Sequence, residues 1–230
     1  MMRALKNAFR RMRLARKGVR VEGDYPKQWM NGYMICPRGL DRNSVIYSVG
    51  VGRHISFDLA LIESFGATVH AFDPTPVSIE WVRGQKLPEQ FVFHDYGVAA
   101  YDGPFRFYPP RRAASAHFTS VPKTKRTDDT LCIEAPVFTL GTIMKKLGHD
   151  HLDLLKLDIE GGEYEVIDDT LKGLIRVRQL IVEFHHNFPT IPMARTVETV
   201  RALQKGGYRL FHLSDRTCEM GFMHGEPDAG

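Results

Sequence analysis

Apolar runs and amphipathic segments alternate along most of the chain, which is the pattern of strands alternating with helices. Runs rich in β-branched and aromatic residues predict strands at residues 45–49, 68–72, 91–94, 105–108, 133–138, 152–157, 179–184, 208–213 and 218–222. Apolar residues at helical spacing predict helices at residues 54–65, 77–83, 142–147, 164–171 and 196–205. We therefore expect an α/β fold with a doubly wound, mostly parallel sheet that closes with an antiparallel C-terminal hairpin.

The N-terminal part of the chain lacks this alternation. Residues 21–43 are broken by prolines and glycines, and they predict an irregular lead-in that Trp29 and Tyr33 anchor onto the body. A length of 230 residues suits one sizeable α/β core. We expect residues 1–43 to form a basic extension and lead-in, and residues 44–230 to form the single domain.

Positive charge is concentrated at the N-terminus. Residues 1–20 hold eight arginines and lysines and no acid, so this tail carries +8, the whole chain +4 and the remaining 210 residues −4. Apolar residues recur in the tail at helical spacing: Met1, Leu5, Ala8 and Met12. Two interpretations stay open, a solvated leader or a basic amphipathic helix on an anionic membrane surface. Contact with nucleic acid is the least favoured use of such a helix.

The rest of the composition is typical of a cytoplasmic protein. No apolar run approaches the ~18 residues that a membrane span needs. The three cysteines, Cys36, Cys132 and Cys218, are scattered and odd in number, which favours reduced thiols over disulfides or a metal centre. We expect a cytoplasmic protein, with peripheral attachment to a membrane through the tail as the open alternative.

The most informative segment, residues 45–73, combines a strand, a glycine turn, a helix, a second strand and a final acid. In an open parallel sheet, ligands bind outside the carboxyl ends of the strands where the strand order reverses. Gly50 and Gly52 let the backbone approach a ligand closely, and Asp73 can accept hydrogen bonds from both hydroxyls of a ribose. These residues predict a site for a nucleotide cofactor.

Two cofactor classes fit such a turn. A dinucleotide fingerprint needs a third glycine, and Ile55 occupies that position. A turn with two glycines and a strand-end acid fits S-adenosylmethionine better. An NAD-dependent oxidoreductase stays open as an alternative, and so does a tight connection that binds no nucleotide.

Carboxylates and a histidine follow two later strands. Asp158 and Glu160 stand two positions apart after one strand, and Glu183 and His185 do so at the end of the next. Residues two apart on a strand face the same side, so neighbouring strands would present both pairs to one crevice. The cluster supports two interpretations. Asp158 and His185 act as general bases for a hydroxyl nucleophile, oriented by Glu160 and Glu183, or all four hold Mg²⁺ or Ca²⁺.

Four sequence strings, taken in order, are similar to those of one known family. VGVG and FDP follow the first two strands of the domain, LDLLKLDIEGGEYEVI spans residues 152–167, and LIVEFH spans residues 180–185. In this order and spacing, residues 45–222 resemble the FkbM family of S-adenosylmethionine-dependent methyltransferases. The string K-x-D-x-E-G-x-E at residues 156–163 is the most specific element.

The resemblance implies a seven-stranded, Rossmann-like class I methyltransferase fold. It also implies methyl transfer, usually to a hydroxyl oxygen on a sugar or another small molecule of the secondary-metabolite type. By the same resemblance, Gly50, Gly52 and Asp73 bind the cofactor, Asp95 lies on its adenine side and Asp158 forms the floor of the site.

One position departs from the family pattern. Many members have aspartate where this chain has Ser48, so Ser48 takes that cofactor-binding position without the charge that would meet the methionine amino group. An alternative of another class stays open: a catalytically silent module that binds an anionic partner through its tail and the basic loop at residues 109–126. The retained acids Asp73, Asp95 and Asp158 argue against it, because clustered acids are costly to keep.

Overall fold

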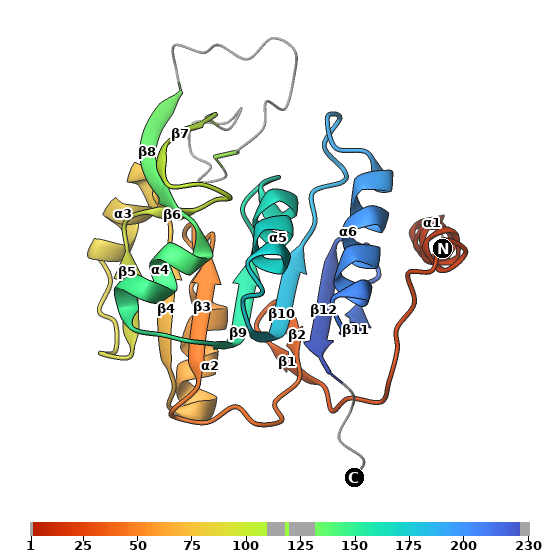
Figure 1. The fold of residues 1–230 in the computed structure, drawn as a ribbon, viewed down its shortest axis with the longest axis horizontal. Coiled ribbons are helices and arrows are strands. Elements are labelled where there is room, and N and C mark those ends of the chain that lie inside the picture. The colour runs from red at the N-terminus through yellow and green to blue at the C-terminus, as the bar shows by residue number, and fades with distance from the viewer. Residues whose placement is uncertain (1, 110–117, 120–131, 226–230) are drawn as a thin grey trace.

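The computed structural model describes residues 2–109, 118–119 and 132–225, which are built around a seven-stranded sheet (Figure 1). The strand order is β11-β12-β10-β9-β3-β4-β5. These strands are β3 (Val45–Val49), β4 (Thr68–Phe72), β5 (Phe91–His94), β9 (Leu152–Leu157), β10 (Val177–Glu183), β11 (Tyr208–Leu213) and β12 (Glu219–His224). β12 runs antiparallel to both of its neighbours, β10 and β11, and the other pairs in this sheet are parallel. The predicted sheet and its closing hairpin are confirmed.

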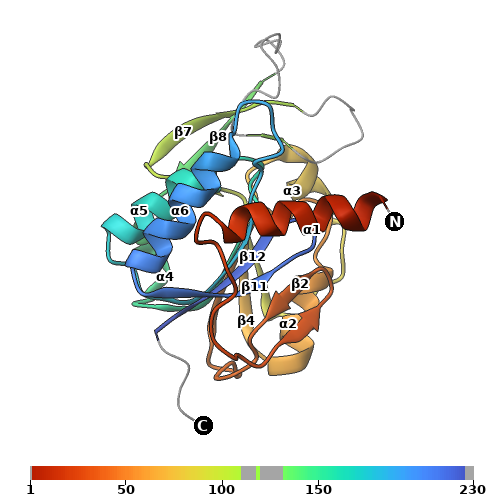
Figure 2. The same ribbon diagram turned by 90° about the vertical axis from the view of Figure 1, so that its right-hand side faces the viewer.

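Helices cover both faces of this sheet (Figure 2). One face carries α4 (Leu140–Leu147), α5 (Glu163–Lys172) and α6 (Met193–Lys205), and the other carries α2 (Ser56–Phe65) and α3 (Pro76–Arg83). Each layer buries its own apolar cluster, to which α5 contributes Ile167 and α6 Val200 on the first face, and α2 contributes Leu61 on the second. Each such side chain, when fully buried, stabilises the folded state by about 1.5–3 kcal/mol relative to an exposed one.

The lead-in is more regular than the sequence predicts. It forms a hairpin of β1 (Gln28–Met30) and β2 (Tyr33–Ile35), which the Gln179 side chain ties to β10 through the backbone of Cys36 at 2.6 and 3.0 Å. The prediction that Trp29 anchors the lead-in onto the body is wrong, because its side chain is 58% exposed. Neighbouring strand residues face opposite sides, so Met30 packs inward while Trp29 faces out. Tyr33 does reach the body.

A second, three-stranded sheet stands at the carboxyl end of the main one (Figure 1). It contains β6 (Gly97–Val98), β8 (Ile133–Phe138) and β7 (Gly103–Phe107), in that order. Two of these strands were predicted, but the sequence did not separate them from the main sheet. The basic loop at residues 109–126 lies outside the described residues, apart from residues 109 and 118–119.

The tail forms a helix, α1 (Met2–Ala15), which is one of the two alternatives that the sequence left open. Leu14 and Val19 are buried in the core next to α6, which fixes the end of the helix on the body. Phe9 and Met12 are 61% and 46% exposed. In the part of the chain that the structure describes, no helix has both the length and the apolar character to cross a membrane.

Candidate active site

A cavity of about 430 Å³ lies at the carboxyl ends of β3, β4 and β9. Since β3 pairs with β4 on one side and β9 on the other, the strand order reverses here, which is where open α/β sheets bind ligands. The volume is in the usual range for small-molecule sites. The hairpin, the small sheet and the connection between β6 and β7 add to its wall; their residues there include Tyr33, Val98, Tyr101, Phe105, Phe107 and Val137.

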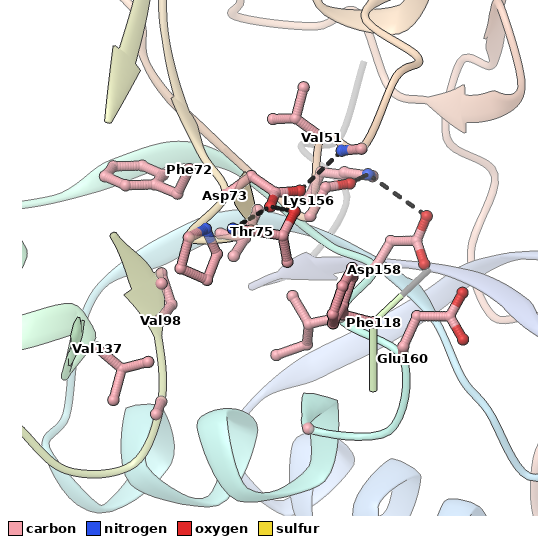
Figure 3. A pocket seen from close by; sticks show the side chains of 18 of the residues that line it. Val51, Phe72, Asp73, Thr75, Val98, Phe118, Val137, Lys156, Asp158 and Glu160 are labelled. Carbon is pink, nitrogen blue, oxygen red and sulfur yellow. Dashed lines mark hydrogen bonds and ion pairs between the residues drawn. The ribbon is translucent and has the colours of Figure 1, made fainter. Parts of the chain in front are cut away.

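The glycine turn and Asp73 meet on this wall (Figure 3). Gly50 has a φ of 84°, and a Cβ there would collide with the carbonyl oxygen of Asp158, so only glycine fits. Asp73 is buried, and its Oδ2 accepts a hydrogen bond from the Gly52 N–H at 2.8 Å. Its Oδ1 accepts two from Thr75, one from the N–H at 2.9 Å and one from the hydroxyl at 2.6 Å. Asp73 Oδ2 therefore keeps one lone pair for a further donor.

Two predicted cofactor residues are not part of the cavity wall that the described chain forms. Ser48 is 1% exposed within β3, between Ala71 of β4 and Lys156 of β9. Asp95 follows β5 at the surface, where its Oδ2 lies 3.4 Å from Arg83 Nη2. Ser48 is thus buried beneath the wall and Asp95 faces solvent, so cofactor contact by either residue stays a prediction without geometric support.

The two predicted acid pairs converge, because β9 and β10 are parallel neighbours. His185 Nε2 lies 3.8 Å from Asp158 Oδ1 and 3.8 Å from Glu160 Oε2. Asp158 and Glu160 line the cavity, whereas Glu183 and the buried His185 are set back from its wall. We call these four residues the acidic edge.

Glu163, the first residue of α5, fixes the position of the acidic edge through hydrogen bonds. Its fully buried carboxylate accepts hydrogen bonds at Oε1 from the Ile159 N–H at 3.0 Å and the Gly161 N–H at 3.1 Å. The same oxygen accepts a hydrogen bond from His185 Nδ1 at 2.9 Å. Within the turn so fixed, Glu160 adopts a φ of 53°, which is uncommon for any residue but glycine. Strain of this kind gathers at functional sites.

Crowding shifts two pKa values at the acidic edge. Burial lowers the pKa of His185, but the hydrogen bond with Glu163 and the charges of Glu160 and Asp158 outweigh burial and raise it to about 9. His185 is therefore a cation at neutral pH, which favours charge balance over the predicted role as a base. Burial and the charge of Asp158 raise the pKa of Glu183 to about 7.

Tyr33 and Lys156 complete the acidic edge, although sequence reasoning assigned neither to the site. The Tyr33 hydroxyl donates a hydrogen bond to Asp158 Oδ2 at 2.8 Å and lies 3.5 Å from Glu183 Oε2. Lys156 Nζ donates to the Gly50 carbonyl at 3.0 Å and lies 3.5 Å from Asp158 Oδ2 (Figure 3). Burial and the charges of Asp158 and Glu183 raise the pKa of Tyr33, so its hydroxyl stays a donor. The position of Lys156 in K-x-D-x-E-G-x-E was a usable signal, whereas Tyr33 offered none.

Comparison with known proteins identifies the class of protein to which this cavity belongs. The family model described as the methyltransferase FkbM domain matches residues 49–210, which is more than half of the chain. The chain belongs to the FkbM methyltransferase family. It is 25% identical over 177 residues to proteins of Rattus norvegicus and Homo sapiens that are both named "Probable methyltransferase-like protein 24". Each match covers 73% of this chain but only 42% of the relative's own length.

The methyltransferase FkbM from Methylobacillus flagellatus KT superposes with a TM-score of 0.48 at 13% identity. The superposition covers 80% of this chain and 44% of that protein.

Membership of the FkbM family implies S-adenosylmethionine as the cofactor, and the cavity fits this ligand. The turn at Gly50 and Gly52 presents backbone without side chains, and Asp73 Oδ2 can accept from a ribose hydroxyl. Val98 and Val137 offer an apolar wall suited to a purine. Within residues 2–109, 118–119 and 132–225, no group of three or more His, Cys, Asp or Glu side chains is arranged to hold a metal ion. The predicted Mg²⁺ or Ca²⁺ therefore has no ligand set there.

Proposed function

We propose that the protein transfers a methyl group from S-adenosylmethionine to a hydroxyl of a neutral small molecule, such as a sugar or another acceptor of the secondary-metabolite type. The observation that carries this proposal is the setting of Asp158. It is a carboxylate on the cavity wall, with Tyr33 and Lys156 at one of its oxygens. Family membership supplies the reaction class, and the acidic edge supports the choice of acceptor.

The cofactor, when bound, supplies an electrophilic methyl group on its sulfonium. An alcohol oxygen is a weak nucleophile until its proton leaves, and a positioned base contributes about 10²–10⁴-fold to the rate. In our proposal, Asp158 accepts that proton. The Tyr33 hydroxyl fixes Oδ2, and the charges of Lys156 and His185 stabilise the carboxylate. A fixed carboxylate holds the acceptor oxygen in line, and such positioning lowers the barrier further.

The charge of the cavity wall favours a neutral acceptor. Among the described residues that line it, five carry carboxylates and two, Arg53 and Lys156, carry basic side chains; the five are Asp58, Asp73, Asp158, Glu160 and Glu165. A phosphorylated or carboxylic acceptor would be repelled, since like charges facing each other cost several kcal/mol. The rings of Tyr101 and Phe105 are stacked at 6.1 Å and offer an apolar face for a sugar ring.

A separate proposal concerns the tail. α1 exposes Phe9 and Met12 among the exposed arginines Arg10, Arg11 and Arg13. An anionic membrane surface fits this chemistry, because the apolar side chains can enter the headgroup boundary while the arginines meet lipid phosphates. We propose that the protein attaches there peripherally.

The test of the proposed reaction uses isotopically labelled S-adenosylmethionine. A cell extract is incubated with the protein and searched by mass spectrometry for labelled products. We expect label on the oxygen of a neutral hydroxyl compound, and about 10²–10⁴-fold less label with Asp158→Asn protein that still binds S-adenosylhomocysteine. Label on nitrogen or carbon would refute O-methylation, and an Asp158→Asn protein of full activity would remove the proposed base.

A further inference from the structure

The first turn of α2 carries a buried carboxylate beside the glycine turn. Asp58 is 2% exposed and is among the residues that line the cavity. Its Oδ1 has no hydrogen-bond partner among the residues that the structure describes. A buried carboxylate oxygen without a partner is costly, because burial removes hydrating water and replaces it with nothing. Oδ1 itself is closed off from solvent, but Asp58 lines the cavity, so a ligand that brings a donor to this carboxyl group would offset that cost.

The nearest basic side chain, that of Lys156, donates no hydrogen bond to Asp58 Oδ1. The charge of Lys156 and the nearby Ser48 hydroxyl lower the pKa of Asp58, but burial raises it by more. Lys156 Nζ makes its short contacts with the Gly50 carbonyl at 3.0 Å and with Asp158 Oδ2 at 3.5 Å. A cation that carries N–H groups is the best match for Asp58, since a charge-assisted hydrogen bond is about twice as strong as a neutral one.

We propose that Asp58 binds the α-ammonium group of S-adenosylmethionine, a contact for which Ser48 offers no charge. This inference rests on the proposed function, because it needs the cavity to hold that cofactor. α2 begins at Ser56, just after the glycine turn, so Asp58 and Asp73 border the same turn. The two carboxylates would then bind different parts of the ligand: Asp73 would bind the ribose, and Asp58 would bind the amino-acid part.

Binding measurements test this assignment without an acceptor. Isothermal titration calorimetry compares S-adenosylhomocysteine with its deamino analogue, in which hydrogen replaces the α-amino group. Wild-type protein should bind S-adenosylhomocysteine about 10- to 100-fold more tightly, as expected for a hydrogen bond between charged groups. Asp58→Asn should bring this ratio close to one by weakening S-adenosylhomocysteine alone. The matched control Asp73→Asn should weaken both ligands and preserve the ratio.

Each other outcome has a definite meaning. A ratio that is unchanged in Asp58→Asn overturns the assignment. Equal affinity of the two ligands for wild-type protein overturns it as well, and this comparison needs no variant if Asp58→Asn fails to fold. Wild-type protein that binds neither ligand would overturn the proposed function and this inference together.

Discussion

The cavity has two ends, the glycine turn and the acidic edge. The hydrogen bonds at these two ends join residues that are separated by very different lengths of chain. At the glycine turn, Asp73 bonds to Gly52 and Thr75, and the longer of these links spans 21 positions. At the acidic edge, the Tyr33 hydroxyl reaches Asp158 across 125 positions and Glu183 across 150. The balance of charge differs too. N–H and O–H donors surround Asp73, whereas the cations Lys156 and His185 flank Asp158.

This contrast separates two parts of the proposed reaction. A contiguous segment carries the expected cofactor contacts, so these form as soon as β3, α2 and β4 pack together. The proposed acceptor chemistry needs β9, β10 and the N-terminal hairpin in register, because its groups come from all three. Changes at one end should therefore leave the other largely intact, and each prediction below tests that separation.

The largest effect should come from Asp158→Asn. Transfer of labelled methyl groups to extract products should fall by about 10²–10⁴-fold, because the variant cannot take up the acceptor proton. Binding of S-adenosylhomocysteine, measured by calorimetry, should change little. A matching loss of ligand affinity would show that the two ends do not act separately.

Protonated His185 should stabilise the fold on the acid side of its titration. Its pKa rises from 6.5 to about 9 on folding, so the contribution is complete below about pH 6.5 and is lost as the pH rises through 9. The full change is on the order of 3 kcal/mol. Urea unfolding at pH 6 and pH 9.5 measures it, and His185→Gln should flatten the difference.

The same titration separates two roles of His185. If His185 balances charge, methyl transfer should fall as the pH rises through 9. If it is the base, transfer should instead rise over that range. If His185 balances charge, EDTA should leave the rate of methyl transfer unchanged. A loss of rate with EDTA that Mg²⁺ or Ca²⁺ restores would instead support the metal alternative.

Asp73→Ala should act at the glycine turn, the cofactor end of the cavity. With S-adenosylhomocysteine at ~100 times its dissociation constant, wild-type protein should gain about 2.7 kcal/mol of stability. The variant should lose most of this gain, because Asp73 accepts from the ribose and orders the turn. Thermal unfolding with and without ligand gives the result, with NAD as the ligand that should not stabilise either protein. An unchanged gain in the variant would remove Asp73 from the site.

Sequence reasoning located residues of the cavity wall where one segment carries the whole signal, while their roles in binding and catalysis stay predictions. Gly50 and Asp73 were placed because their strand, turn and helix are contiguous, and Asp158 followed from its position at a strand end. Tyr33 was missed as a site residue, because a three-residue strand has no measurable periodicity and nothing local marks its distant partner. The same shortness hid the outward orientation of Trp29. Long-range pairing of short elements is thus the limit of prediction here.

Tyr33→Phe sharpens the comparison further. The ring should keep its edge contact with Phe57, at 5.0 Å, while the hydrogen bond to Asp158 disappears. We expect kcat to fall about tenfold, as for the loss of one hydrogen bond to a charged group. Affinity for S-adenosylhomocysteine should stay the same. A wild-type kcat in this variant would leave Tyr33 with a packing role only.

The smallest effect on the cavity should come from the tail. Deleting residues 1–20 would remove the buried Leu14 and Val19, so a double change of the exposed Phe9 and Met12 to serine is the cleaner test. Wild-type protein should sediment with anionic vesicles at low salt and less so at high salt, because salt screens the arginines. The double variant should lose this binding and keep the full stabilisation by S-adenosylhomocysteine. Wild-type protein that ignores such vesicles at low salt would refute membrane attachment, while both ends of the cavity would stand unaffected.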